Sequence, residues 1–271
     1  MTSSAGQDVA RDISIVRADA RYEDLKGRGA IVTGGASGIG RATVLALARS
    51  GCNTAIIDLP DRREAAEETI RLGAAQGSKV TYLSADVTIT ESIERAVQTM
   101  LEHFGSLSIW VNGAGRVVRR PALDLTQEDW DSVLDVNLRG AFFCAQTAAR
   151  AMRHSGGGSI VNIASIFGLL GAANRAAYAA SKAGLVNLTR CLAVEWYPLH
   201  IRVNAVAPSF VRTPLTEQLL ADGLDIQDRA LGSGLPEPDD VAAAVCFLAS
   251  DQAARMITGH VLPIDNGWSA W

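Results

Sequence analysis

A short apolar strand, a glycine-rich turn and a helix with an apolar stripe follow one another near the start of the chain. No other stretch constrains the fold as strongly. The strand is predicted over residues 28–33, the turn over 34–40 and the helix over 41–50. Glycines let the backbone of such a turn approach a pyrophosphate, whose charge then meets the unpaired amides and the positive dipole end of the helix. This order of elements indicates an α/β fold with a dinucleotide site at the turn.

The next strand supports that interpretation. It is predicted over residues 53–58 and ends in Asp58, 18 residues after Gly40. This is close to the spacing expected for a carboxylate that binds the ribose hydroxyls of a dinucleotide. Further strands and helices alternate along the chain, including a helix over about 126–153 that carries Asn137 and a helix that starts with a capping box at Asp61. Repeated crossovers of this kind predict a parallel sheet with helices on both faces.

Tyr178 and Lys182 form the second informative pattern. Residues at i and i+4 share one face of a helix, so the ammonium can lie beside the phenol. A cation about 4 Å away favours the phenolate by up to about 4 kcal/mol at an effective dielectric constant of about 20. We therefore expect the pKa of Tyr178 to fall towards neutrality. Ser165 ends a predicted strand over 159–165, where the ligand crevice of an α/β sheet opens.

Taken together, these patterns resemble the short-chain dehydrogenase/reductase family in its classical branch. Residues 33–40 match the glycine motif of that family, and Asn137, Ser165, Tyr178 and Lys182 match its catalytic tetrad. The resemblance extends from about residue 26 to the C-terminus. It implies one Rossmann-type, doubly wound parallel sheet of about seven strands. The family's loop after the fourth strand is also present, although Gly113 replaces its second Asn.

The resemblance also implies a mechanism and a cofactor site. Tyr178 would exchange the proton of a secondary alcohol, Ser165 would hold the substrate oxygen, and Lys182 would lower the pKa of Tyr178 and reach the nicotinamide ribose. Asn137 would hold a water that links Lys182 to solvent. The cofactor-binding residues would include Tyr178 and Lys182 themselves, together with Gly34, Ser37, Gly38, Ile39, Gly40, Asp58, Asp86, Val87, Asn112, Ala114, Gly115, Pro208, Val211 and Thr213.

Charge favours NAD over NADP as the cofactor. Asp58 would accept the 2′- and 3′-hydroxyls of the adenosine ribose, but its charge would repel a 2′-phosphate. Ser37 stands where the family usually carries a basic residue that reads this phosphate.

Charge and residue patterns limit the partners and the location that can be expected. The net charge of −4 and the absence of a basic stripe indicate neither nucleic acid nor an anionic membrane surface as a partner. No apolar run reaches transmembrane length and no signal peptide is visible, so a cytoplasmic location is expected. The cysteines and histidines show no ligand spacing, and no metal site is expected. A homo-oligomer, with a tetramer as the usual form, is expected from the family resemblance alone.

Three segments stand apart from the regular pattern. Residues 1–24 are polar and aperiodic and predict a surface arm in front of a single domain over 25–271. Residues of about 210–238 correspond to the family's substrate-covering lid. The C-terminal tail contains Trp268 and Trp271, which we expect to be packed because exposed Trp is costly.

The substrate class follows only from resemblance. The sequence is similar to bacterial polyol, sugar and sugar-acid dehydrogenases of the family. An NADPH-dependent 3-oxoacyl-[acyl-carrier-protein] reductase and a non-catalytic dinucleotide-binding regulator are the alternatives. Five polar residues are expected near the pocket mouth, where they could bind substrate hydroxyls or a carboxylate, although surface solvation explains each as well: Arg119, Arg120, Asn174, Arg175 and Arg212.

Overall fold

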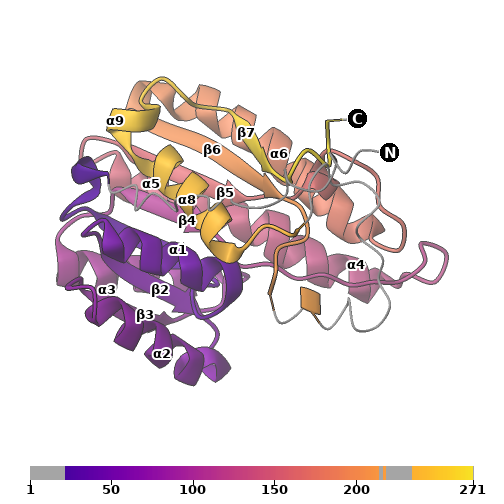
Figure 1. Cartoon of the computed structure of the whole chain (residues 1–271), viewed down its shortest axis with the longest axis horizontal. Coiled ribbons are helices and arrows are strands. Elements are labelled where there is room, and N and C mark those ends of the chain that lie inside the picture. The colour runs from indigo at the N-terminus through magenta and orange to yellow at the C-terminus, as the bar shows by residue number, and fades with distance from the viewer. Residues whose placement is uncertain (1–21, 214–215, 218–233, 271) are drawn as a thin grey trace, which may run out of the picture.

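The computed structural model describes residues 22–213, 216–217 and 234–270, which build one parallel β-sheet with helices on both faces (Figure 1). The strand order is β3-β2-β1-β4-β5-β6-β7. The predicted fold class, a Rossmann-type doubly wound sheet, is confirmed. The strands are β1 (Gly29–Thr33), β2 (Asn53–Asp58), β3 (Val80–Ser84), β4 (Ile109–Asn112), β5 (Gly158–Ile163), β6 (Ile201–Pro208) and β7 (Val261–Ile264).

Helices cover the two faces of the sheet and bury a separate apolar layer against each. Side chains alternate along β1, so that Ala30 and Val32 belong to one layer and Ile31 to the other. The first layer includes Leu47 and Leu248 from the covering helices α1 and α8. The described helices are α1 (Gly38–Arg49), α2 (Arg63–Ala74), α3 (Thr90–Phe104), α4 (Gln127–Leu134), α5 (Ala141–Met152), α6 (Ala176–Trp196), α8 (Pro238–Ala249) and α9 (Asp251–Ala254).

The strand order reverses between β1 and β4, and this reversal fixes where a ligand can bind. Val32 of β1 pairs with Val111 of β4, and the chain leaves the sheet at the same edge after both strands. Helices depart to opposite faces on the two sides of such a switch point, which opens a crevice at the carboxyl ends of the strands. The glycine turn after β1 and the loop after β4 therefore lie side by side.

The structure corrects three helix predictions. The first helix, α1, begins at Gly38 and not at Arg41. Pro60–Arg62 is a 3-10 turn and α2 begins only at Arg63, without a side-chain cap. Leu59, not Asp61, takes the extended conformation that a capping residue needs. The helix predicted over 126–153 does start with Thr126 as its cap, whose side chain accepts a hydrogen bond from the Asp129 amide. A π-helical segment, Asp135–Gly140, then separates α4 from α5.

The predicted arm and lid fall mostly outside the described residues, which exclude 1–21, 214–215, 218–233 and 271. The last residues of the arm belong to the folded body. Tyr22 packs against the core, and the Asp24 carboxylate accepts hydrogen bonds from the Asp251 amide at 2.7 Å and from the Ser250 hydroxyl at 2.9 Å.

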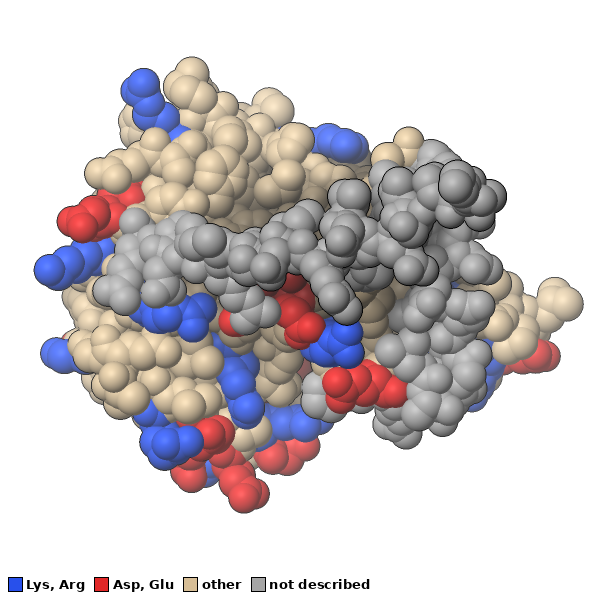
Figure 2. Space-filling view, in the orientation of Figure 1, with Lys and Arg blue, Asp and Glu red and all other residues tan. Residues whose placement is uncertain are grey.

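Basic and acidic side chains are interspersed on the face shown in Figure 2. Among the described residues, no helix is long and apolar enough to cross a membrane. Over the same residues, no group of three or more His, Cys, Asp or Glu side chains could hold a metal ion. Three of the four cysteines are buried and Cys191 is exposed.

A buried arginine fastens the second half of the sheet to its covering helix. Arg202 of β6 donates hydrogen bonds to the carbonyls of Leu248 at 2.7 Å and Ala249 at 3.2 Å, and it pairs with Asp251 at 2.9 Å. The last carbonyls of a helix lack intrahelical partners, and Arg202 satisfies those of α8. Arg28 also pairs with Asp251, which extends the network to the start of β1.

Replacement of Arg202 by Met should therefore lower the free energy of unfolding by about 3 kcal/mol, because buried carbonyls and one carboxylate lose their donor. Chemical denaturation measures this change. Arg190→Met, on the exposed side of α6, is the matched control and should shift stability by less than about 0.5 kcal/mol. Equal stability of the two variants would contradict the assigned role of Arg202.

Candidate active site

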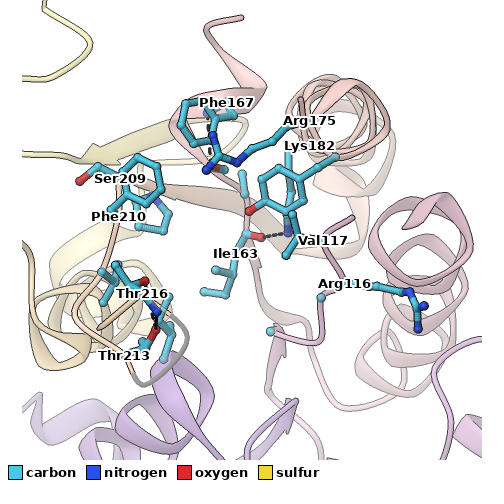
Figure 3. Close-up of a pocket in the computed structure, with 18 of the residues that line it drawn as sticks. Arg116, Val117, Ile163, Phe167, Arg175, Lys182, Ser209, Phe210, Thr213 and Thr216 are labelled. Carbon is cyan, nitrogen blue, oxygen red and sulfur yellow. Dashed lines mark hydrogen bonds between the residues drawn. The ribbon is translucent and has the colours of Figure 1, made fainter. Parts of the chain in front are cut away.

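One pocket of about 280 Å³ opens at the carboxyl edge of the sheet (Figure 3). Its walls come from segments far apart in the sequence, which the strand order brings together. They are the β1–α1 turn, the loop after β4, the end of β5, the start of α6 and the loop after β6. The predicted site residues that line it are Ile39, Gly115, Ser165, Tyr178, Lys182, Pro208, Val211 and Thr213.

Ser165 and Tyr178 meet at this pocket from different elements. Ser165 follows β5 and caps a short 3-10 helix, where its hydroxyl accepts a hydrogen bond from the Phe167 amide at 3.2 Å. Tyr178 lies in the first turn of α6. The close approach of α6 to the segment after β5 is possible because Gly168 lies against α6, where an added Cβ would come within 2.7 Å of the Lys182 carbonyl.

Lys182 is buried one turn further along α6 and faces the same pocket. Its ammonium donates a hydrogen bond to the Ile163 carbonyl at 2.7 Å and lies 5.7 Å from the centre of the Tyr178 ring. Burial disfavours the charged form and lowers the pKa of Lys182 to about 8. Lys182 can therefore gain or lose its proton in the pH range in which many enzymes work.

The prediction that the pKa of Tyr178 falls is wrong for the enzyme without its cofactor. Burial raises the pKa of Tyr178, and the nearby Ser165 hydroxyl and the charge of Arg175 oppose this rise without cancelling it. Tyr178 is accordingly a neutral phenol near pH 7, ready to donate a proton.

Asn137, the fourth predicted catalytic residue, lies behind the pocket in the π-helical segment. Its amide group donates to the Arg116 carbonyl and the Ser181 hydroxyl, and its carbonyl accepts from the Arg116 amide. Ser181 in turn donates to the Tyr178 carbonyl. With both amide hydrogens used, the Asn137 side chain joins the loop after β4 to the first turns of α6, and its oxygen keeps a lone pair for the expected water.

The glycine turn has the form of a phosphate cradle. Gly40 lies so close to Gly34 that an added Cβ would come within 2.1 Å of the Gly34 carbonyl oxygen. Gly34 and Gly38 adopt φ angles of +70° and +53°, which favour glycine. Ser37 precedes α1 without a side-chain hydrogen bond to its first amides. These amides are thus available to an anion, and a Cβ at Gly38 would meet only Thr213, at 3.7 Å.

Asp58 lies at the end of β2 against this turn. Its two oxygens accept hydrogen bonds from the Ala36 and Leu59 amides at 3.1 and 3.0 Å. This fixes the carboxylate while leaving lone pairs for hydroxyl groups. Asp86 is held through one oxygen by the Thr88 amide and hydroxyl, and Val87 follows it. The residues present fit a dinucleotide that extends from Asp58 across the turn to the pocket.

Two other predicted cofactor residues have their polar groups occupied inside the protein. Both amide hydrogens of Asn112 go to the Ala141 carbonyl and the Asn162 side chain, and its oxygen accepts from Trp110. Ala114 donates its backbone amide to the Thr33 hydroxyl. The side chain of Asn112 therefore supports the loop from within and does not face the pocket.

An aromatic wall of the pocket escaped sequence reasoning. Phe167 and Phe210 pack edge to face with ring centres 5.5 Å apart, and Trp268 follows at 5.8 Å from Phe210. The expected packing of the tail is confirmed for Trp268, which is buried, whereas Trp271 lies outside the described residues. In the sequence, only the position of Phe167, two residues after Ser165, could have indicated an aromatic side chain at the pocket.

The arginines expected at the pocket mouth divide into two pairs. Arg119 and Arg175 line the pocket. Arg120 and Arg212 do not, since they pair with Asp129 and Glu237 on the surface.

Known proteins with similar sequences cover nearly the whole chain. A family model described as enoyl-(acyl carrier protein) reductase matches residues 34–269. The chain is 35% identical to 2-dehydro-3-deoxy-D-gluconate 5-dehydrogenase of Escherichia coli, over 91% of this chain and 97% of the relative. It is 39% identical to cis-4-hydroxycyclohexanecarboxylate dehydrogenase of Sinomonas cyclohexanicum, over 90% of this chain and 97% of the relative.

A solved structure from Burkholderia xenovorans, described as a short-chain dehydrogenase/reductase, superposes with a TM-score of 0.85 at 33% identity and covers 92% of this chain and 99% of its own. This chain belongs to the short-chain dehydrogenase/reductase family. The enzyme is thus an oxidoreductase that acts on CH–OH groups with a nicotinamide dinucleotide.

The depressed pKa of Lys182 predicts how the stability of the cofactor-free enzyme depends on pH. Lysine titrates near 10.4 in the unfolded chain, so between pH 8 and about 10.4 the folded state binds fewer protons than the unfolded state. The contribution of Lys182 to the free energy of unfolding should therefore rise by about 3 kcal/mol across this window. Urea denaturation of the wild type and Lys182→Met at several pH values measures the difference, and a flat difference would contradict the assignment.

Proposed function

We propose that this enzyme uses NAD to interconvert a secondary alcohol and its ketone, with a polyol, sugar or sugar acid as the substrate class. One observation carries the proposal: Ser165, Tyr178 and Lys182 face a pocket that also borders the glycine turn. The two relatives named above act, by their names, on a sugar acid and on a cyclic hydroxy acid.

In the proposed mechanism Tyr178 transfers the proton and Ser165 holds the oxygen that receives or loses it. The raised pKa keeps the phenol protonated near neutral pH, so Tyr178 can donate directly to a ketone oxygen. In alcohol oxidation Tyr178 must first become a phenolate. Lys182, with its pKa of about 8, is then the nearby group whose charge can stabilise it.

Asn137 acts as a positioning residue in this scheme. It binds the backbone of Arg116 on one side and Ser181 on the other, and Ser181 holds the Tyr178 carbonyl. This chain of hydrogen bonds fixes the start of α6 relative to the loop after β4. A displacement of about 1 Å at a reacting group can reduce the rate about 100-fold, so such fixation matters for catalysis.

The cofactor would be held by the glycine turn, Asp58, Asp86 and the pocket residues Pro208, Val211 and Thr213. Its nicotinamide ring supplies hydride acceptance and donation when bound. Asp58 supports NAD over NADP, because a carboxylate at this place accepts ribose hydroxyls and repels a phosphate. Ser37 offers no positive charge in compensation.

A 3-oxoacyl-[acyl-carrier-protein] reductase remains the second candidate, because relatives with that name are 35% and 36% identical to this chain. Asp58 and the net charge of −4 weigh against the NADPH and the acidic carrier protein that such an enzyme uses. A cytoplasmic location stays a prediction, and so does a homotetramer, which the family resemblance alone supports.

Tyr178→Phe should reduce turnover by about 100- to 10,000-fold, because it removes the proton donor and acceptor but keeps the ring. NAD reduction, followed by absorbance across polyols, sugar acids and simple secondary alcohols, measures the loss. Tyr197→Phe, at an exposed phenol just beyond the far end of α6, is the control and should retain turnover. Saturable NAD binding without turnover of any alcohol or ketone would instead indicate a non-catalytic regulator.

Asp58→Asn should weaken the preference for NAD over NADP by about tenfold or more, because the repulsion of a 2′-phosphate disappears. The ratio of kcat/KM for the two cofactors measures the effect. An unchanged ratio would show that Asp58 does not select the cofactor. Asp61→Asn, an exposed acid three residues further on, controls for the loss of one negative charge.

A further inference from the structure

We propose that Arg175, assisted by Arg119, binds a carboxylate of the substrate, so that the enzyme acts on hydroxy acids and their oxo acids. The inference rests on the proposed function of the same pocket and names the substrate class within it.

Arg175 is held over the pocket by aromatic rings. It precedes α6, and its side chain reaches across the pocket towards Phe167 (Figure 3). The guanidinium carbon lies 5.1 Å from the centre of the Phe167 ring and 5.2 Å from that of Phe210. Packing of the flat guanidinium group against aromatic rings fixes its position without using its N–H donors. Arg175 is therefore preorganised, with donors left for a ligand.

No described carboxylate neutralises Arg175 or Arg119. In contrast, Arg120 and Arg212 each have an acidic partner within the described residues. Burial lowers the pKa of Arg175, and repulsion by the charge of Arg119, which lines the same pocket, lowers it further. An anion between them would relieve this repulsion and accept charge-assisted hydrogen bonds.

The described pocket lining carries four basic residues and no acidic one, although the whole chain has a net charge of −4. Two of the four bases are otherwise engaged. Lys182 donates to the Ile163 carbonyl, and the guanidinium of Arg116 points away from the pocket (Figure 3). Arg119 and Arg175 are left to recognise a negative group of the substrate.

Arg175 and Tyr178 would contact two different groups of the substrate. Arg175 is the residue just before α6, Tyr178 lies in the first turn of this helix, and both line the pocket. No side chain caps this end of α6, whose dipole adds positive potential there. A substrate that places its hydroxyl at Tyr178 would present a carboxylate to Arg175, while the ring of Phe210 would cover its carbon skeleton.

Binding of matched probes to the enzyme saturated with NADH tests the proposal without turnover. Calorimetry should show that cyclohexanecarboxylate binds about 10- to 100-fold more tightly than the neutral cyclohexanecarboxamide, as expected for hydrogen bonds to a charged group. Arg175→Met should abolish this difference. Arg175→Lys should retain part of it, because the charge stays but the paired donors are lost.

Arg71→Met is the matched control, since it removes one positive charge from the exposed surface of α2. It should preserve the full difference between the two probes. Equal binding of acid and amide to the wild type would overturn the proposal, and this comparison holds even if Arg175→Met does not fold.

Kinetics separates this inference from the proposed function. With 4-hydroxycyclohexanecarboxylate and its amide as substrates, the ratio of kcat/KM for acid over amide should fall about 10- to 100-fold in Arg175→Met. Turnover without any preference for the acid would overturn the inference and leave the proposed function standing. No turnover, with tight and Arg175-dependent acid binding, would overturn the proposed function and support the carboxylate site.

Discussion

The close contact between β1 and the loop after β4 is the constraint on which the site depends. Thr33, fully buried at the end of β1, accepts hydrogen bonds from the Gly113 and Ala114 amides at 3.0 and 3.1 Å. In this geometry a Cβ at position 113 would come within 2.6 Å of the Thr33 carbonyl oxygen. Glycine at this position, where the family carries Asn, therefore fits the contact. This contact holds the glycine turn beside the loop that carries Gly115, and both border the pocket.

A second set of contacts links the loop after β4 to α6. The π-helical segment turns Asn137 inward, where it binds both the loop after β4 and Ser181. π-bulges often occur at functional sites because they re-aim a side chain at the cost of regular helix geometry. Here the re-aimed amide ties the loop after β4 to the first turns of α6. Polar groups behind the pocket thus add to the rigidity of the site.

The sequence predicted what depends on local pattern. Strand and helix periodicity, the glycine turn and the one-turn spacing of Tyr178 and Lys182 each need only a few consecutive residues, and the parallel sheet followed from their alternation. The interruption of the helix over 126–153 was missed because Asn137 bonds to Ser181, 44 residues away. The false cap at Asp61 arose because Pro60 starts a 3-10 turn that places Asp61 in a helical conformation.

The pKa values of the site residues were the hardest property to predict from the sequence, because each depends on burial and on every neighbouring charge. The spacing of Tyr178 and Lys182 could not show how far Tyr178 is buried, and burial raises the pKa of this phenol. Lys182 and Arg175 both have pKa values lowered by burial. Natural proteins tolerate such unfavourable charges mainly at functional sites, where a ligand supplies the missing partner. Burial of cations that the described residues leave without a carboxylate costs stability in the free enzyme, and the same charges give an anionic ligand most of its attraction.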